Sequence, residues 1–393
     1  GYFARGMGVG QPKWFDGPDG RHLLFQRNVE GREARRALVR GTLSEEQLAE
    51  ISEGLPDECR EILGWWRRKA IAEDADGGQR RIDESDWDDV DLCDITDPEW
   101  CLCISKSAGN KAADANSVHI NLLKALLPAK RCKRDGQPDV AEELLTAECS
   151  ALLSAVRRAL VVTLRSGIIA RSELQSILCT IGKVEGSNDL VDSRPLTLMA
   201  IAINLATGIQ MTKVTRRLDE LSAIDSWQAG FRARTGTEEP LLETRLVAEH
   251  CWQHKTDLYV GDEDKSKAFD SPPEEIIEMS LDRFAVPYRY IMLLTMLGNE
   301  AEICVRTAHG LARHYSKRQG MPQGARYSPD LWTITDDPLC TAMADEARFD
   351  EAAPAVVSVP FAPPVRVSGK SYADDKRFLA STHAGLQRRF DIS

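Results

Sequence analysis

The 393-residue sequence has no hydrophobic run long enough to cross a membrane. Its longest apolar stretch, Leu196 to Ile209, falls short of the roughly 18 residues that a spanning helix needs. The first residues, GYFARGMGVGQPKW, contain no apolar segment followed by a small-residue cleavage site, so they do not resemble a signal peptide. They also lack an initiator Met, which indicates that the sequence starts within a longer protein. We therefore expect an intracellular protein that makes no membrane contact.

A complete set of zinc-binding residues is also missing. The one tight cysteine cluster, Cys93 with Cys101 and Cys103, has no second C-x-C or H-x-H pair nearby, so the cysteines are expected to be reduced core residues. Acidic residues outnumber basic ones, 61 to 50, and the net charge of −11 argues against a protein that coats nucleic acid non-specifically. Acidic residues gather between Glu73 and Asp94, whereas Lys and Arg punctuate the later segments, so the charge does not exclude a local basic groove.

What is present is an ordinary globular composition, 42% hydrophobic and 28% charged, in a chain long enough for two or more domains. Residues 42–69 predict a helical hairpin with a capping start at Thr42 or Ser44 and a break at Gly54 to Pro56. The polar, acidic stretch from Asp74 to Asp97 predicts a linker. We therefore predict an N-terminal extension of unknown function, partly helical, over residues 1–92, and a second unit over residues 93–393.

Beyond the linker, the hydrophobic pattern changes between the helical and the strand period. Helices are expected over residues 118–127, 140–164, 196–221 and 274–297. Strand character is expected over residues 177–183, 257–260 and 302–316, the last as a hairpin that turns at His309-Gly310. This mixture predicts an α+β fold.

Two segments place acids where a strand meets a turn. In DLYVGDEDKSKAFDS a strand-like run leads to Asp264, and in VRVSGKSYADDKRFLAS two strand-like runs flank Asp374 and Asp375. Carboxylates this close raise one another's pKa unless a cation lies among them. A set of oxygen ligands favours Mg²⁺. The three aspartates therefore predict a divalent metal site.

A third segment, GMPQGARYSPDLW, lies between these two in the sequence. Its Gly320, Pro322 and Gly324 fix a backbone that a base pair could approach closely, and Gln323 and Arg326 would be its polar arms. A helix is expected to start at Ser328 or Pro329.

Taken in order, DKSKAFDS, GMPQGARYSP and SYADD resemble motifs A, B and C of reverse transcriptases. Upstream, SRPLTL resembles the fingers motif RPIS, and QAGFRARTGTEEPLL resembles the QxGFRxGxST segment. The stretch VRTAHGLARHYSKRQGMPQG is similar to the hairpin that precedes motif B in LINE-like (non-LTR) retroelements. The resemblance runs from about residue 104 to residue 379. It departs from the family at GNKAADAN, which stands where the family has PGPDG.

The resemblance implies an RNA-directed DNA polymerase of a retrotransposon, which joins dNTPs to a primer 3′-hydroxyl by a two-metal reaction. Its partners would be an RNA template, a DNA primer and dNTPs, and its cofactor would be two Mg²⁺ ions, with Mn²⁺ as the alternative. Asp264, Asp374 and Asp375 would be the catalytic metal ligands, with the backbone carbonyl of Lys265 as a further ligand. The dNTP would be bound by Lys183, Arg194, Ala268, Phe269, Gln323 and Gly324, with Phe269 as the sugar gate. Tyr372 would support the catalytic turn.

The resemblance further implies right-hand polymerase fingers and palm over residues 93–393, with an antiparallel palm sheet backed by helices. Nothing after Ser393 corresponds to the family's thumb, so we expect a sequence truncated before that domain. Two alternatives stay open. One is an inactive retroelement fragment that retains the fold and at most binds nucleic acid. The other is an RNA-directed RNA polymerase, although such enzymes normally carry Gly-Asp-Asp instead of Ala-Asp-Asp.

Overall fold

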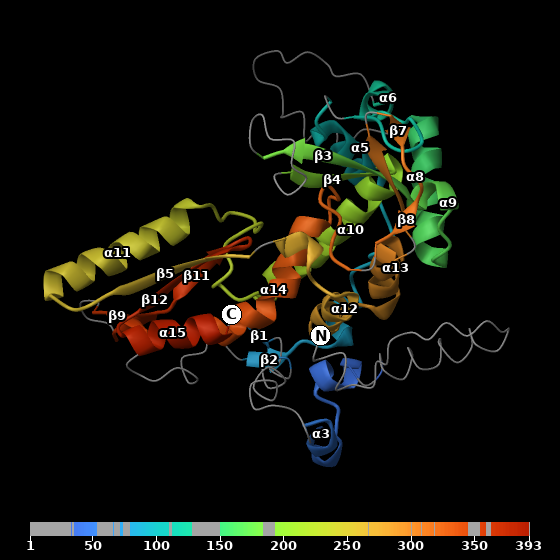
Figure 1. Cartoon of the computed structure of the whole chain (residues 1–393). Coiled ribbons are helices and arrows are strands. Elements are labelled where there is room, and N and C mark those ends of the chain that lie inside the picture. Colours follow the sequence, from blue (N-terminus) through green and yellow to red (C-terminus); the bar gives the residue numbers. More distant parts are fainter. Residues whose placement is uncertain are drawn as a thin grey trace, which may run out of the picture.

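The computed structural model describes residues 33, 35–52, 66, 71–73, 79–109, 112–127, 150–183, 193–265, 267–299, 301–307, 309–317, 319–344, 354–358 and 363–392. These residues form a mixed α+β fold with two main sheets (Figure 1). A three-stranded sheet lies at the left of Figure 1 and a five-stranded sheet at the upper right, with helices between them. In these ranges no helix is both long and apolar enough to cross a membrane.

The three-stranded sheet is antiparallel and has the order β11-β12-β5, with β5 at Tyr259–Asp264, β11 at Gly369–Tyr372 and β12 at Asp375–Ala380. Helix α15 (His383–Ile392) packs on β12 and β5, and its Phe390 ring meets the buried Phe378 ring edge-on with centroids 5.2 Å apart. Gly261 of β5 leaves room for this helix, because a Cβ there would lie 2.6 Å from Phe390. Helix α11 (Glu238–His254) packs against β11. The short hairpin of β9 (Ala355–Val357) and β10 (Val365–Val367) lies next to α11.

The five-stranded sheet is built around the antiparallel pair β3 (Gln175–Gly182) and β4 (Ser193–Met199). Strand β6 (Glu302–Thr307) joins β3 in parallel, and β7 (Gly310–Leu311) and β8 (Tyr315–Ser316) both pair with β6. The expected strands at residues 177–183 and the expected hairpin at residues 302–316 are therefore present. The turn of that hairpin includes Gly310 at a φ of 114°, a conformation that glycine adopts without strain.

One hydrophobic core joins the helices between the sheets. Its central members are α10 (Ile201–Glu220), α12 (Glu274–Arg283), α13 (Tyr288–Asn299) and α14 (Ser328–Ala344). The helices α5 (Asp97–Lys106), α6 (Ile120–Ala125), α8 (Ala151–Ser166) and α9 (Arg171–Leu174) lie on the other side of α10 and next to the five-stranded sheet. Helix α14 starts at Ser328, as expected.

Two expected helices are wrong in their extent. Residues 196–199 belong to strand β4, and the helix begins only at Ile201, because pairing with β3 outweighs the helical pattern of this apolar run. Residues 274–297 form two helices, since Ala285 has a φ of 52° and Pro287 follows it. At residues 118–127 the helix is shorter than expected, at Ile120–Ala125. Of the helix expected over residues 140–164, the C-terminal part is present in α8 (Ala151–Ser166), and residues 140–149 lie outside the described residues.

The N-terminal residues pack on α12. Helix α3 (Glu45–Ser52) is capped by Ser44, whose hydroxyl accepts from the Gln47 amide at 3.2 Å, while most of the second half of the expected hairpin lies outside the described residues. Arg36 Nε is 3.0 Å from the buried Asp282 carboxylate, and Leu38 and Val39 pack against Met279. The division at residue 92 stays a prediction.

The acidic stretch that was expected to be a linker contributes to the main core where it is described. Strands β1 (Ile71–Glu73) and β2 (Gln79–Arg81) form a hairpin, and a 3-10 turn, η1 (Glu84–Trp87), follows it. Trp87 is buried and its indole N–H donates to the Phe284 carbonyl at 3.0 Å. The acids of this stretch therefore flank buried side chains.

The cysteines are mostly as expected, with one correction. Six described cysteines are free thiols, namely Cys93, Cys103, Cys179, Cys251, Cys304 and Cys340. Cys101, which is buried in α5, is instead part of a disulfide whose partner is outside the described residues.

The loop after α10 contains an acid whose ionisation opposes folding. Burial is the main reason that the pKa of Asp225 is raised to about 6, and its carboxylate accepts from the Trp227 amide at 2.8 Å. Because the folded-state pKa lies above the unfolded value, this group stabilises the fold fully at low pH and loses that contribution as pH rises through 6. Asp225→Asn should therefore raise the free energy of unfolding at pH 8 by on the order of 2 kcal/mol, and much less at pH 4.

Urea unfolding of both proteins at the two pH values measures this difference. The matched control is Asp262→Asn, because the Arg377 guanidinium holds the pKa of the exposed Asp262 below its usual range. That change should give no stabilisation at pH 8. A stabilisation by Asp225→Asn that is equal at both pH values would contradict the role of its charge.

Candidate active site

Two of the predicted metal ligands lie opposite each other on neighbouring strands. Asp264 ends β5, Asp375 begins β12, and the two residues are register partners. Side chains of directly opposed residues share one face of a sheet, with Cα atoms roughly 4.5–5.5 Å apart. Both aspartates are exposed. Asp264 and Asp375 are thus adjacent although they are more than a hundred positions apart in the sequence, as the two motifs predicted.

Asp374 lies in the two-residue turn between β11 and β12, directly before Asp375. Ala373, the first residue of this turn, has a φ of 60°, in the left-handed region that alanine rarely adopts. Asp375 points outward from the sheet while Lys376, the next residue, is fully buried. Because successive side chains of a strand point to opposite faces of the sheet, Asp375 lies on the exposed face and Lys376 on the buried one.

The acids repel one another. Desolvation, and then the Asp374, Asp264 and Asp262 carboxylates, raise the pKa of Asp375. Asp262 is already paired, because Arg377 donates to both Asp262 oxygens, at 2.6 and 2.8 Å. A divalent cation among Asp264, Asp374 and Asp375 would remove the repulsion, so this donor set fits Mg²⁺.

Among the described residues, no three His, Cys, Asp or Glu side chains already form a cage that could hold a metal. Mg²⁺ does not require such a cage, because it is usually bound by one or two carboxylates, waters and substrate phosphates. Lys265 follows Asp264 directly, so its carbonyl is next to the acids in the chain, while its side chain is largely buried and its pKa is lowered by that burial and by Lys376.

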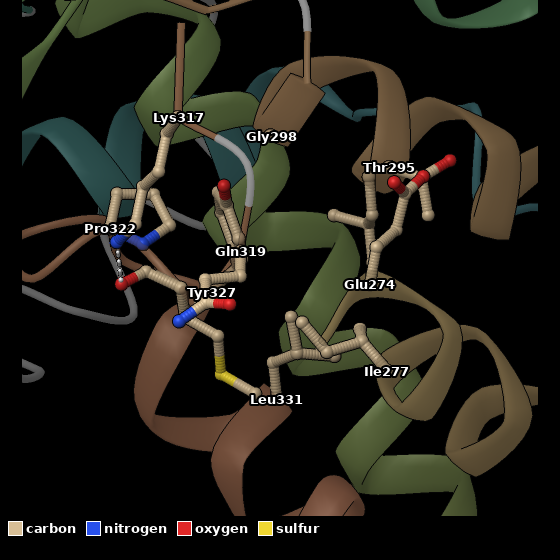
Figure 2. Close-up of a pocket in the computed structure, with 12 residues that line it drawn as sticks. Glu274, Ile277, Thr295, Gly298, Lys317, Gln319, Pro322, Tyr327 and Leu331 are labelled. Carbon is tan, nitrogen blue, oxygen red and sulfur yellow. Dashed lines mark hydrogen bonds between the residues drawn. The ribbon is translucent and has the colours of Figure 1, made fainter. Parts of the chain in front are cut away.

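The segment after Asp264 is held by the Gly320–Gly324 turn. Met321 N–H donates to the Phe269 carbonyl at 2.6 Å, and Gly320 N–H donates to the Pro272 carbonyl at 2.8 Å. Gly320 has a φ of 82°, and a Cβ there would lie 2.6 Å from the Asp270 backbone, so only glycine fits. Figure 2 shows a recess behind this turn, between α12, α13 and α14, where Lys317 Nζ donates to the Met321 carbonyl at 3.0 Å.

The same turn contacts the other sheet. Thr197 N–H of β4 donates to the Gln323 carbonyl at 2.6 Å, and a Cβ on Gly324 would lie 2.7 Å from the Thr197 carbonyl oxygen. Gln323 and Gly324 therefore link strand β4 of the five-stranded sheet to the segment that follows β5. The Gln323 amide donates to Asp270 at 3.0 Å.

Arg326 was expected to extend from this turn as a polar side chain, but the structure places it differently. Its guanidinium donates to Ser107 Oγ at 2.6 Å and lies 3.3 Å from Cys103 Sγ, so it links the turn to α5. The reason is that Gly208 of α10 leaves space for its side chain; a Cβ at Gly208 would lie 2.8 Å from Arg326.

The Phe269 ring is held between two other aromatic rings. Trp332 of α14 lies on one side with centroids 5.6 Å apart and planes inclined by 30°, and Phe231 meets Phe269 edge-on at 6.2 Å. Ala268, the preceding residue, is buried in the short 3-10 turn η3 (Ala268–Asp270). The ring thus has a defined orientation beside the acids.

Lys183 and Arg194 lie together at the end of the β3–β4 pair where the chain passes from β3 to β4. Arg194 pairs with Ile181 in the sheet, Lys183 directly follows β3, and both side chains are exposed. Among the described residues neither has an ion-pair or hydrogen-bond partner. Figure 1 shows this end of the hairpin facing the side of the molecule on which the three-stranded sheet lies. No described contact joins these cations to the acids.

The family described as "Reverse transcriptase (RNA-dependent DNA polymerase)" matches residues 199–392. The chain carries a reverse transcriptase domain. The match includes Asp264, Asp374 and Asp375 and begins after Lys183 and Arg194.

The domain is related to a retrotransposon protein. It is 22% identical over 202 residues to the retrovirus-related Pol polyprotein of the type-2 retrotransposable element R2DM of Drosophila melanogaster, over 51% of this chain and 18% of that protein. The chain thus spans less than a fifth of this relative.

Two solved structures of apo telomerase from Candida tropicalis are also similar to this chain. One has a TM-score of 0.40 at 11% identity, over 62% of this chain and 46% of that one. The form truncated from its C-terminal domain has a TM-score of 0.38 at 12% identity, over 57% of this chain and 47% of that one.

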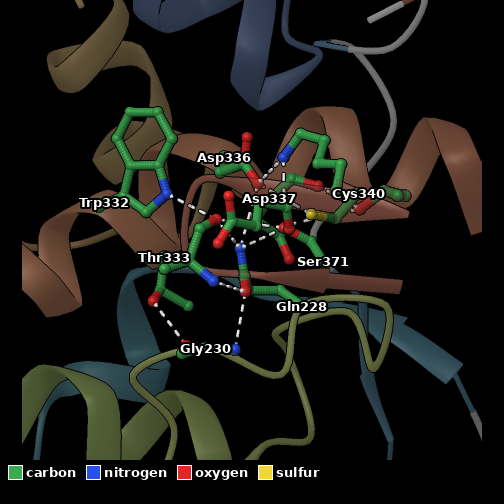
Figure 3. Close-up of polar contacts among 12 residues, drawn as sticks. Gln228, Gly230, Trp332, Thr333, Asp336, Asp337, Cys340 and Ser371 are labelled. Carbon is green, nitrogen blue, oxygen red and sulfur yellow. Dashed lines mark hydrogen bonds and ion pairs between the residues drawn. The ribbon is translucent and has the colours of Figure 1, made fainter. Parts of the chain in front are cut away.

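Inside the reverse transcriptase domain, the structure brings together polar residues that the motif reading missed. Gln228, Asp336 and Lys376 are buried, come from three separate segments, and meet behind the Ala373–Asp374 turn (Figure 3). The sequence gives little signal for them, because Lys376 stands between Asp375 and Arg377 and Asp336 stands beside Asp337, and charged residues are mostly exposed unless they are paired. Tyr372 is half-buried at the end of β11, opposite Asp375.

Proposed function

We propose that this chain is an RNA-directed DNA polymerase that joins dNTPs to a primer 3′-hydroxyl on an RNA template. The observation that carries the proposal is the register pairing of Asp264 with Asp375, beside the Asp374 turn, in a chain with a reverse transcriptase domain. The coarser conclusion, membership of the reverse transcriptase family, does not depend on this proposal.

In this proposal the three aspartates hold two Mg²⁺ ions, with Mn²⁺ as a substitute. Asp264 and Asp374 would be the main ligands, Asp375 would support them, and the Lys265 carbonyl would add a further ligand. The ions supply charge for the attacking primer oxygen and the leaving pyrophosphate in an in-line displacement. The protein's own part is to keep the carboxylates on one face of the sheet, which requires the β5–β12 register.

The nucleotide would lie between the two sheets. Lys183 and Arg194 would contact its triphosphate, because exposed cations without partners can turn toward phosphate oxygens at little cost. Ala268, Phe269, Gln323 and Gly324 would line its sugar and base, and Tyr372 would support the turn from below. The β3–β4 sheet would then be the fingers and the β5–β11–β12 sheet the palm, within a polymerase unit over residues 93–393.

Primer extension on an RNA template with Mg²⁺ tests the proposal, using this chain and a longer chain that continues past Ser393. We expect dNTP-dependent extension that stops when the RNA template is omitted. Extension with ribonucleotides alone would favour an RNA polymerase. If neither chain extends a primer but both bind a primer–template duplex, the protein is an inactive member of the family.

Arg194→Ala should raise the KM for dNTP about tenfold and change kcat less, because a lost triphosphate contact weakens binding before the chemical step. Arg194→Lys is the matched control, since it keeps the charge and loses the planar guanidinium. Its KM for dNTP should lie between those of the wild type and Arg194→Ala. Steady-state kinetics at varied dNTP concentration give both constants. A wild-type KM for Arg194→Ala would mean that Arg194 is an ordinary surface cation.

A further inference from the structure

The Ala373–Asp374 turn is held from behind by one fully buried side chain. Gln228 Oε1 accepts from the Ala373 N–H at 3.1 Å, and Gln228 Nε2 donates to the Ala373 carbonyl at 3.1 Å. The amide orientation is fixed by chemistry, because Oε1 also accepts from the Gly230 N–H at 2.8 Å and two backbone donors require an oxygen. Both polar groups of Ala373, the residue with a φ of 60°, thus bond to one amide.

The Gln228 amide is itself held in place. Its nitrogen donates to Asp336 Oδ2 at 3.1 Å and to Ser371 Oγ at 3.2 Å, and Lys376 Nζ lies 2.5 Å from the same Asp336 oxygen (Figure 3). The Asp336 and Lys376 side chains are 3% and 0% exposed, so this pair is shielded from water. Desolvated ion pairs of this kind are costly to disrupt and have few alternative geometries.

Backbone contacts close the arrangement. Ala229 N–H donates to the Ser371 carbonyl and Ser371 N–H donates to the Trp227 carbonyl, both at 2.8 Å. Trp332 Nε1 adds a donor to the Ala373 carbonyl at 3.0 Å. Gly230 has no room for a side chain, because a Cβ there would overlap the Ala373 amide. The segment 227–230 is therefore fitted against the turn that carries Asp374.

We propose that Gln228 is a positioning residue, which holds the Ala373 backbone in its left-handed conformation and so directs the Asp374 carboxylate toward Asp264. Alanine disfavours this conformation, so without the two bonds from Gln228 the turn would relax and Asp374 would move away from the metal site. The expected effect of Gln228 on catalysis rests on the proposed function, whereas its support of the Ala373 backbone does not.

Gln228→Met tests the proposal, because methionine matches glutamine in length and removes all of its hydrogen bonds. The matched control is Trp227→Phe, which removes one neighbouring bond, from the indole to Ser368 Oγ at 3.1 Å, and leaves the turn untouched. Three measurements are made on each chain: hydrogen exchange of the peptide that contains residues 371–375, Mn²⁺ binding by electron paramagnetic resonance, and primer extension.

For Gln228→Met we expect faster exchange in that peptide, several-fold weaker Mn²⁺ binding, and a kcat about fivefold lower with a KM for dNTP within twofold of wild type. Trp227→Phe should match wild type in all three. Adding Ala373→Gly to Gln228→Met should recover at least half of the lost kcat, since glycine adopts a positive φ without help. A merely structural role for Gln228 predicts no such rescue.

Wild-type exchange and Mn²⁺ binding in Gln228→Met would overturn the proposal, and so would a lack of rescue by Ala373→Gly. If Gln228→Met does not fold, Trp332→Phe replaces it, because it removes a bond to the same Ala373 carbonyl; unchanged exchange in that variant would also overturn the proposal. If the wild-type chain extends no primer, the proposed function fails, whereas the exchange and Mn²⁺ results still decide whether Gln228 holds the turn.

Discussion

Asp374→Asn should lower the rate of primer extension at least about a thousandfold, which corresponds to roughly 4 kcal/mol of lost transition-state stabilisation. The amide cannot supply the negative charge that a ligand shared by two divalent cations needs. The fold should survive, because the Asp374 side chain is only partly buried and its charge raises the pKa of Asp375. Removing this repulsion should leave the melting temperature in the absence of metal unchanged or slightly higher.

Asp262→Asn is the control for this prediction. Asp262 lies on the same face as Asp264, two residues earlier in β5, but its carboxylate is paired with Arg377. Asp262→Asn changes only the local charge and should therefore keep the extension rate within about threefold of wild type. Asp374→Asn, which removes a metal ligand, should not. Single-turnover extension with saturating Mg²⁺ measures both variants. More than a tenth of wild-type activity in Asp374→Asn would remove Asp374 from the metal site.

The position of the acids at strand ends was predictable because the information is local. A strand-like run before Asp264 and two such runs around Asp374 and Asp375 place the acids there, and the resemblance to the family indicates which strands are neighbours. The two-residue turn fixes the register of β11 against β12. The register of β12 against β5, which brings Asp375 opposite Asp264, depends on long-range pairing that the turn does not determine.

The misread elements have tertiary causes. An apolar run such as residues 196–209 satisfies both the helical and the buried-strand pattern, and only the presence of β3 beside it determines that residues 196–199 form a strand. The orientation of Arg326 likewise depends on the space above Gly208, which belongs to another helix. Neither neighbour can be identified from the local sequence.

The buried network behind the turn shows a different limit. Asp336 and Lys376 each stand next to another charged residue, so nothing in the sequence marks them as buried or as partners of each other. Gln228 is still less conspicuous, because a glutamine before Ala-Gly-Phe-Arg fits an exposed loop equally well. Its function as a support for Ala373 becomes visible only when both polar atoms are seen to meet the same residue.

Phe269→Val should raise ribonucleotide incorporation relative to deoxynucleotide incorporation at least tenfold and up to about a hundredfold. The Phe269 ring follows Asp264 by five positions and is fixed between Trp332 and Phe231. A ring held there would contact the C2′ side of a sugar whose triphosphate is bound at the metals, so a 2′-hydroxyl would clash with it. Valine opens that space, and a tenfold change needs only about 1.4 kcal/mol of lost discrimination.

The matched control is Phe390→Val, because Phe390 is an equally large ring on α15 that packs on Phe378 behind the sheet. That variant can lose stability but should keep the wild-type sugar ratio, which separates a gate from a general loss of packing. Competition between each dNTP and its ribonucleotide on one RNA template measures the ratio directly. Were Phe269→Val to incorporate the two sugars in the wild-type ratio, Phe269 would not be the gate, and the alignment of DKSKAFDS with motif A would be wrong by at least one residue.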